Sequence, residues 1–127
     1  MRAVDTNVLV RLIVRDDPKQ VAAAGAFVAS GAWVSQLALV EAMWVLAAVY
    51  DRDAGQIATA VDMLLTHDRL TIQESDTVAS ALAAFRGRPQ LGFSDCLMLE
   101  IARRAGHVPL GTFDRDLGRL PDARRLI

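Results

Sequence analysis

The chain contains few of the residues on which extracellular and zinc-binding folds depend. A single cysteine, Cys96, rules out an internal disulfide and fits a reducing cytoplasm. The two histidines, His67 and His107, have no cysteine or histidine companions at zinc-ligand spacing. No stretch resembles a bilayer span of roughly 20 apolar residues, and the N-terminal MRAVDTN has an acid where a signal peptide would have its apolar core. These absences predict one soluble cytoplasmic domain over residues 1–127, with no membrane segment.

Lysine is almost absent as well, and the charge is nearly balanced. Of 14 basic residues, 13 are arginines, and the formal net charge is −1, which is not the strongly basic balance common in nucleic-acid-binding domains. Eight arginines lie from Arg86 onward, a distribution that suits phosphate contacts but is also expected from a GC-rich genome. Hydrophobic residues make up 53% of the chain, an excess that suggests a surface buried against a partner.

Apolar periodicity and turn residues predict short strands that alternate with helices, which is the pattern of an α/β/α sandwich around a short-stranded parallel sheet. We expect residues 87–92 (GRPQLG) to form a loop, and Arg11 and Arg15 to share a helix face. The predicted strands are 2–4, 31–35, 69–73, 107–113 and 123–127, and the predicted helices are 5–14, 18–29, 35–50, 54–66, 74–85 and 94–105, the last with Ser94 as N-cap and Gly106 as C-cap.

Four acidic residues occupy comparable positions in this pattern. Asp5 and Asp114 directly follow the first and fourth strands, and Asp95 lies in the first turn of its helix. Glu41 is the only charge in SQLALVEAMWVLAAVY, where an ionised side chain needs a gap to solvent, a partner or a metal. Because parallel α/β folds bind ligands at the carboxyl ends of their strands, we expect the four acids to meet in one crevice.

Each acid also has a purely structural explanation. Asp5 is well placed to cap a helix, and Asp95 to complement a helix dipole. Asp114 and Asp116 are suited to a solvated loop. Four carboxylates in one place repel one another unless a cation neutralises them, and Mg²⁺ or Mn²⁺ is the usual partner of oxygen ligands. Such a cluster favours phosphodiester hydrolysis, in which the metal activates water and stabilises the departing oxygen.

The segments VDTNVLVRLIV, ALVEAMWVL, FSDCLMLEIARRAG and TFDRDL together resemble a PIN-domain ribonuclease over essentially the whole chain. The chain length and the lack of extra domains are similar to VapC-type toxins of VapBC toxin–antitoxin pairs. The resemblance implies a Mg²⁺-dependent endoribonuclease that acts on RNA and forms a homodimer, and whose activity a cognate antitoxin blocks. It implies that Asp5, Glu41, Asp95 and Asp114 form the catalytic metal site, with Mn²⁺ as a substitute ion, and that Thr6, Thr112 and Asp116 support it.

Other functions remain open from the residues alone. A PIN nuclease outside any toxin pair is the main alternative. An aspartate-nucleophile phosphotransfer protein would have an acid at Asn7, or a lysine late in the chain, whereas the only lysine is Lys19. A degenerate, non-catalytic nuclease fold would not require the complete acid set. Trp33 and Trp44 are expected in the core or a dimer contact, and the Arg103–Arg104 and Arg124–Arg125 pairs either follow phosphates or are solvated charges.

Overall fold

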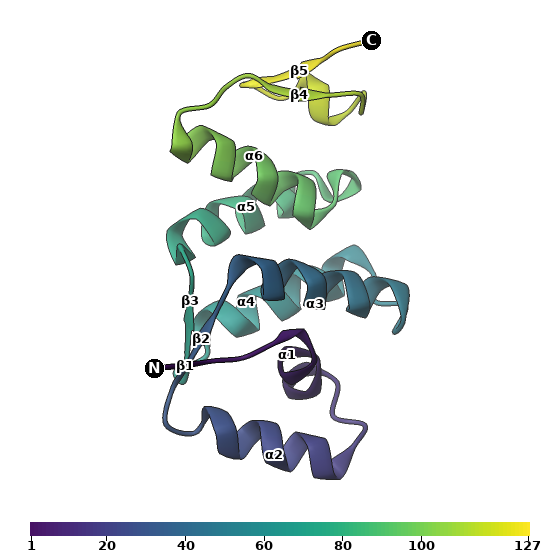
Figure 1. Ribbon diagram of the computed structural model, residues 1–127. Coiled ribbons are helices and arrows are strands. Elements are labelled where there is room, and N and C mark those ends of the chain that lie inside the picture. The colour runs from purple at the N-terminus through teal and green to yellow at the C-terminus, as the bar shows by residue number, and fades with distance from the viewer. The chain divides into compact units, whose positions relative to one another are not determined.

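Short strands alternate with helices along the computed structural model, which describes residues 1–127 (Figure 1). The chain divides into two units, Met1–Ser75 and Asp76–Ile127, each with its own parallel strand pairing. The mixed α/β class with short parallel strands confirms the fold predicted from the sequence. No helix has the length and apolar character needed to span a membrane.

The N-terminal unit contains three parallel strands in the order β1-β2-β3. The backbone of Arg2 pairs with Ala32, and that of Ala32 pairs with Leu70. Its elements are β1 (Arg2–Ala3), α1 (Thr6–Ile13), α2 (Pro18–Val28), β2 (Ala32–Val34), α3 (Gln36–Ala48), α4 (Ala54–Thr66) and β3 (Leu70–Ile72).

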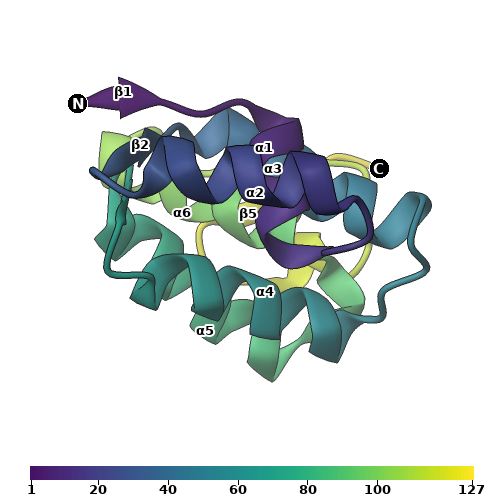
Figure 2. The same ribbon diagram turned by 90° about the horizontal axis from the view of Figure 1, so that it is seen from below.

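The helices of this unit enclose a core of aliphatic side chains. Helix α1 packs against both α2 and α3, and α3 packs against α4. Figure 1 shows α1 nearly end-on between α2 and α3, and Figure 2 shows that it crosses them. The fully buried side chains include Leu9, Val10, Val34, Leu39, Leu46, Val61 and Leu64. This core fixes the start of α1 relative to α3, the two elements that carry Asp5 and Glu41.

The C-terminal unit is built from two long helices followed by a two-stranded parallel sheet. The Phe85 and Phe93 rings meet edge to face with their centroids 6.1 Å apart, and both side chains are buried. Its elements are α5 (Ser75–Gly87), the 3-10 helix η1 (Pro89–Leu91), α6 (Phe93–Ala105), β4 (Leu110–Thr112), the 3-10 helix η2 (Leu117–Arg119) and β5 (Ala123–Arg125).

Three local predictions were wrong. Arg15 lies beyond the end of α1 and therefore does not share a helix face with Arg11. The expected loop at residues 87–92 is shorter than predicted, because Gly87 ends α5 and Pro89–Leu91 form the 3-10 turn η1. Helix α6 begins at Phe93 and follows Gly92, so Ser94 lies inside the first turn and is not the N-cap. Gly106 does end α6 in the left-handed conformation that a glycine C-cap requires.

Candidate active site

In the N-terminal unit, Asp5 follows β1 and forms the N-cap of α1. Its Oδ1 accepts a hydrogen bond of 3.1 Å from the backbone N–H of Val8. The capping role expected for an aspartate at this position is therefore real. Capping uses one carboxylate oxygen, and the Asp5 side chain is exposed. The residue can cap the helix and still offer an oxygen to a cation.

Glu41 lies on the open face of α3, where it has a specific partner. The Thr6 hydroxyl donates a hydrogen bond of 2.8 Å to Glu41 Oε2. The sequence suggested a carboxylate enclosed by apolar residues, but the side chain is exposed. Glu41 therefore does not incur the cost of burying an ionised carboxylate among apolar side chains. Its bond with Thr6 places the carboxylate directly beside the segment that carries Asp5.

A hollow of about 440 Å³ lies beside this hydrogen bond and is lined by Thr6, Val40, Glu41, Trp44 and Val45. Trp44 is 67% exposed, so its predicted place in the core is wrong, and a dimer contact stays a prediction. Sequence reasoning missed this hollow because α3 is apolar on all sides, which leaves no polar stripe to mark its open face. Glu41 itself was the only available signal.

In the C-terminal unit, Asp95 lies in the first turn of α6 and is half-buried. Burial raises the pKa of its carboxyl group, and the nearby negative charge of Asp114 raises this pKa further. Both effects disfavour the ionised form. The charge of Asp114 therefore lies within electrostatic reach of Asp95, and a shared metal site for the two acids stays a prediction.

Asp114 is held by the backbone of the turn that follows β4. Its Oδ1 accepts hydrogen bonds from the backbone N–H groups of Asp116 (3.0 Å) and Leu117 (3.3 Å). The Thr112 hydroxyl accepts a 3.0 Å bond from the backbone N–H of Asp114. Thr112 and the turn therefore fix the place of Asp114, while its side chain remains exposed.

Asp116, the other acid of the TFDRDL segment, has a different environment. Its Oδ1 lies 3.8 Å from Arg115 Nε and 3.9 Å from Arg119 Nη1. These two guanidinium groups already balance its charge, whereas no arginine pairs with Asp114. This difference favours Asp114 over Asp116 as the acid that needs a cation.

The donor chemistry of Asp95 and Asp114 fits a hard divalent cation. Burial and the negative charge of Asp114 both disfavour the ionised form of Asp95, and a bound cation would offset this cost. Within either unit, no three acidic, histidine or cysteine side chains gather into a metal-binding group. The joining of Asp5 and Glu41 with Asp95 and Asp114 in one centre stays a prediction.

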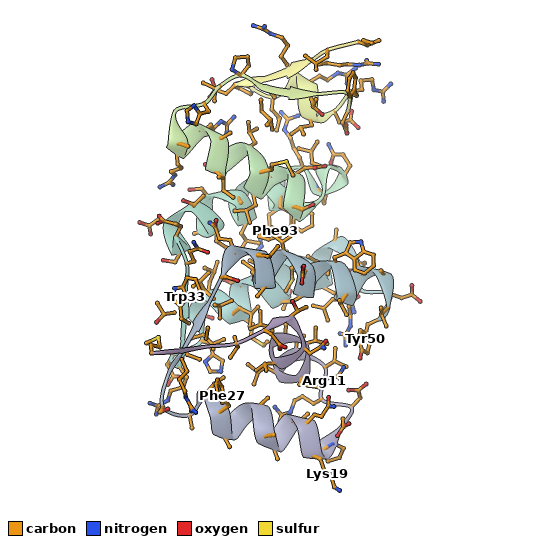
Figure 3. The ribbon with its side chains drawn as sticks, in the orientation of Figure 1. Arg11, Lys19, Phe27, Trp33, Tyr50 and Phe93 are labelled. Atoms are coloured by element: carbon orange, nitrogen blue, oxygen red, sulfur yellow. The ribbon has the colours of Figure 1, made fainter.

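A family model for the PIN domain matches residues 2–123 and runs through both units. This chain belongs to the PIN-domain family. No curated protein and no solved structure matches the chain. PIN domains are generally metal-dependent nucleases, and the roles of Asp5, Glu41, Asp95 and Asp114 in such hydrolysis stay predictions. The alternatives with an aspartate nucleophile lose support, because Lys19 points away from α2 at its exposed first turn (Figure 3).

Proposed function

We propose that this PIN domain is a Mg²⁺-dependent endoribonuclease that hydrolyses RNA phosphodiester bonds. The observation that carries the proposal is the match to a nuclease family, and the half-buried Asp95, whose ionised form the nearby charge of Asp114 disfavours, supports it. A half-buried carboxyl group beside a second carboxylate is poorly suited to a purely structural role. Divalent-metal hydrolysis makes use of this arrangement.

In this proposal, Asp5, Asp95 and Asp114 would hold Mg²⁺, for which Mn²⁺ can substitute. When bound, the metal supplies an activated water and stabilises the departing oxygen. Thr6 orients Glu41 through its 2.8 Å hydrogen bond, and Glu41 positions the attacking water or takes its proton. Thr112 keeps Asp114 in place through the backbone. Asp116 supports the turn and is balanced by arginines.

We further propose that the chain is the toxin of a type II toxin–antitoxin pair, forms a homodimer and is neutralised by a cognate antitoxin. Exposed apolar side chains on and directly after α3 support a protein contact, since Leu37, Trp44 and the C-cap residue Val49 are 69%, 67% and 65% exposed. The high apolar content of the chain supports it as well. A stand-alone PIN nuclease is the alternative within the same chemistry.

The nuclease proposal is tested with purified protein and a single-stranded RNA, in Mg²⁺ and in EDTA, with wild type and Asp95→Asn. We expect cleavage only by the wild type in Mg²⁺. Asp76→Asn is the matched control, because Asp76 is also an acid in the first turn of a helix but is exposed on α5. Equal cleavage in EDTA, or by Asp95→Asn, would exclude the metal site.

The toxin proposal is tested by induced expression in bacteria. Wild type should stop growth, and Glu41→Gln should not, because glutamine can still accept the Thr6 hydrogen bond but cannot take a proton. Co-expression of a small reading frame found immediately upstream should restore growth. Normal growth with an active wild-type nuclease would favour the stand-alone alternative.

A further inference from the structure

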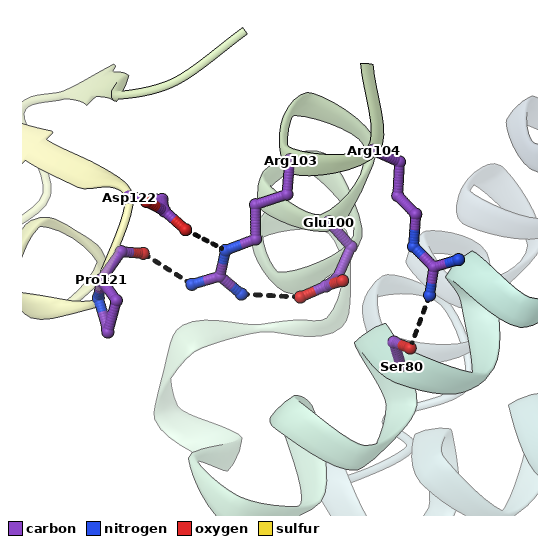
Figure 4. Close-up of polar contacts among 6 residues, drawn as sticks. All are labelled: Ser80, Glu100, Arg103, Arg104, Pro121 and Asp122. Atoms are coloured by element: carbon purple, nitrogen blue, oxygen red, sulfur yellow. Dashed lines mark hydrogen bonds and ion pairs between the residues drawn. The ribbon is translucent and has the colours of Figure 1, made fainter. Parts of the chain in front are cut away.

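The neighbouring arginines Arg103 and Arg104, on the last turn of α6, have different partners (Figure 4). Arg104 Nη2 donates a 3.0 Å hydrogen bond to the Ser80 hydroxyl on α5. Arg103 instead uses three nitrogens. They bond to Glu100 Oε1 at 2.7 Å, to Asp122 Oδ2 at 3.2 Å and to the Pro121 carbonyl at 2.5 Å. Arg103 is therefore committed to protein acceptors and is not free to follow a phosphate backbone.

Two of the Arg103 acceptors lie in the segment that positions Asp114. The Asp122 carbonyl accepts a 2.8 Å bond from the N–H of Leu110, where β4 begins. Strand β5 follows directly and pairs with β4 along its length. The Asp114 turn continues from the end of β4, so Pro121 and Asp122 anchor the same small sheet from which Asp114 projects.

The turn after Asp114 is also tightly attached to β5. A Cβ atom on Gly118 would lie 2.6 Å from Arg125 Cβ, so only glycine permits this approach. The N–H of Gly118 donates to the Asp114 carbonyl at 3.0 Å. The sheet, η2 and the Asp114 turn are thus joined by close backbone contacts. A shift of Pro121 and Asp122 would displace Asp114.

We propose that Arg103 is a positioning residue that sets the placement of Asp114 relative to Asp95 for metal binding. Arg103 and Asp95 belong to the same helix, α6. Arg103 also donates hydrogen bonds to Pro121 and Asp122, which anchor the small sheet from which Asp114 projects. Its side chain is 28% exposed, and Glu100, at 13%, holds the guanidinium from the helix side. A planar guanidinium suits this task because its donors diverge in fixed directions, which a lysine ammonium cannot reproduce.

This inference rests on the proposed metal site, and its test does not depend on RNA cleavage. Mn²⁺ binding to the full chain is measured by calorimetry for wild type, Arg103→Ala, Arg103→Lys and Arg104→Ala. We expect Arg103→Ala to weaken Mn²⁺ binding about tenfold, as is typical when a group that orients metal ligands is lost. Arg103→Lys should restore only part of the affinity, and Arg104→Ala should bind Mn²⁺ like the wild type.

In RNA cleavage, the Arg103→Ala defect should appear as a higher Mg²⁺ requirement with an unchanged KM for RNA, and saturating Mg²⁺ should restore kcat. If Arg103→Ala does not fold, Asp122→Asn removes the charge of one acceptor and suits the left-handed backbone of Asp122, which has φ 66°. That variant should weaken Mn²⁺ binding about two- to threefold.

Wild-type Mn²⁺ affinity in a folded Arg103→Ala protein would overturn the inference, as would wild-type affinity in Asp122→Asn if only that variant folds. An equal loss in Arg104→Ala would also overturn it, because the effect would then be general to α6. A wild-type protein that binds Mn²⁺ but cleaves no RNA would refute the ribonuclease proposal and leave the role of Arg103 standing.

Discussion

The two units hold their acids in different ways. In the N-terminal unit, neutral donors support the carboxylates, since the Val8 N–H bonds to Asp5 and the Thr6 hydroxyl bonds to Glu41. In the C-terminal unit, the half-buried Asp95 is opposed by a second acid, Asp114. Asp5 and Glu41 have hydrogen-bond donors without a cation. The ionised form of Asp95 is disfavoured by burial and by the charge of Asp114, and a cation would offset that cost. The metal requirement should therefore be felt most strongly in the C-terminal unit.

The largest difference between catalytic rate and metal affinity in the N-terminal unit should come from substitution of Thr6. Thr6→Val removes the hydroxyl at nearly constant volume, so Glu41 loses its orienting bond, and we expect kcat for RNA cleavage to fall about tenfold. Thr6→Ser retains the hydroxyl and should remain close to wild type. Metal affinity should change little in both variants. A large loss of Mn²⁺ binding in Thr6→Val would contradict the expectation that metal binding depends mainly on the acids of the C-terminal unit.

A smaller effect concerns stability without metal. The raised pKa of Asp95 means that the folded protein binds its proton more tightly than the unfolded chain does. This contribution to stability is present below the ordinary aspartate pKa and is lost as the pH rises through the raised value. At pH 7 in EDTA, Asp95→Asn should therefore melt at a higher temperature than wild type.

The advantage of Asp95→Asn should shrink at pH 3, where the wild-type carboxyl group is protonated. Mg²⁺ should raise the melting temperature of wild type alone. Thermal unfolding followed by circular dichroism measures all of these differences. A metal-free Asp95→Asn protein that is less stable than wild type at pH 7 would show that Asp95 has a structural partner.

The smallest effect should come from Asp116, one of the two acids of the TFDRDL segment. Asp116 already faces Arg115 and Arg119, so we expect Asp116→Asn to change Mn²⁺ affinity by less than about twofold. Asp114→Asn should weaken this affinity about ten- to a hundredfold. Calorimetry on the two variants compares them directly. The reverse order would make Asp116 the metal ligand.

Much of the fold was readable from the sequence because its signals are local. Asp17 and Pro18 mark the start of α2, and Gly106 marks the end of α6. The N-cap of α6 was misplaced by two residues, because the buried Phe93, which meets Phe85 edge to face, begins the helix directly after Gly92, whose φ is 81°. That contact depends on tertiary packing, which the Ser94 capping signal does not contain.

The positions of Asp5, Asp95 and Asp114 in the fold were predictable, because each acid follows a strand or opens a helix. The exposure of Glu41 was not, because a helix that is apolar on all sides does not reveal which face packs. The role of Arg103 was hidden for another reason. Its acceptors Pro121 and Asp122 lie 18 and 19 residues later, in an irregular segment, so no helical or strand spacing connects them to it.

The central proposal is that Asp5, in the N-terminal unit, and Asp95, in the C-terminal unit, are ligands of one metal ion. A double-mutant cycle tests it, with Mn²⁺ affinity measured by calorimetry for wild type, Asp5→Asn, Asp95→Asn and the double variant. If both acids hold the same ion, Asp5→Asn and Asp95→Asn each weaken the binding of the same single Mn²⁺ ion, and their losses show a coupling energy in the double variant because the two ligands interact through that ion. Full binding in Asp5→Asn, or two Mn²⁺ ions of which each variant loses a different one, would contradict a shared centre.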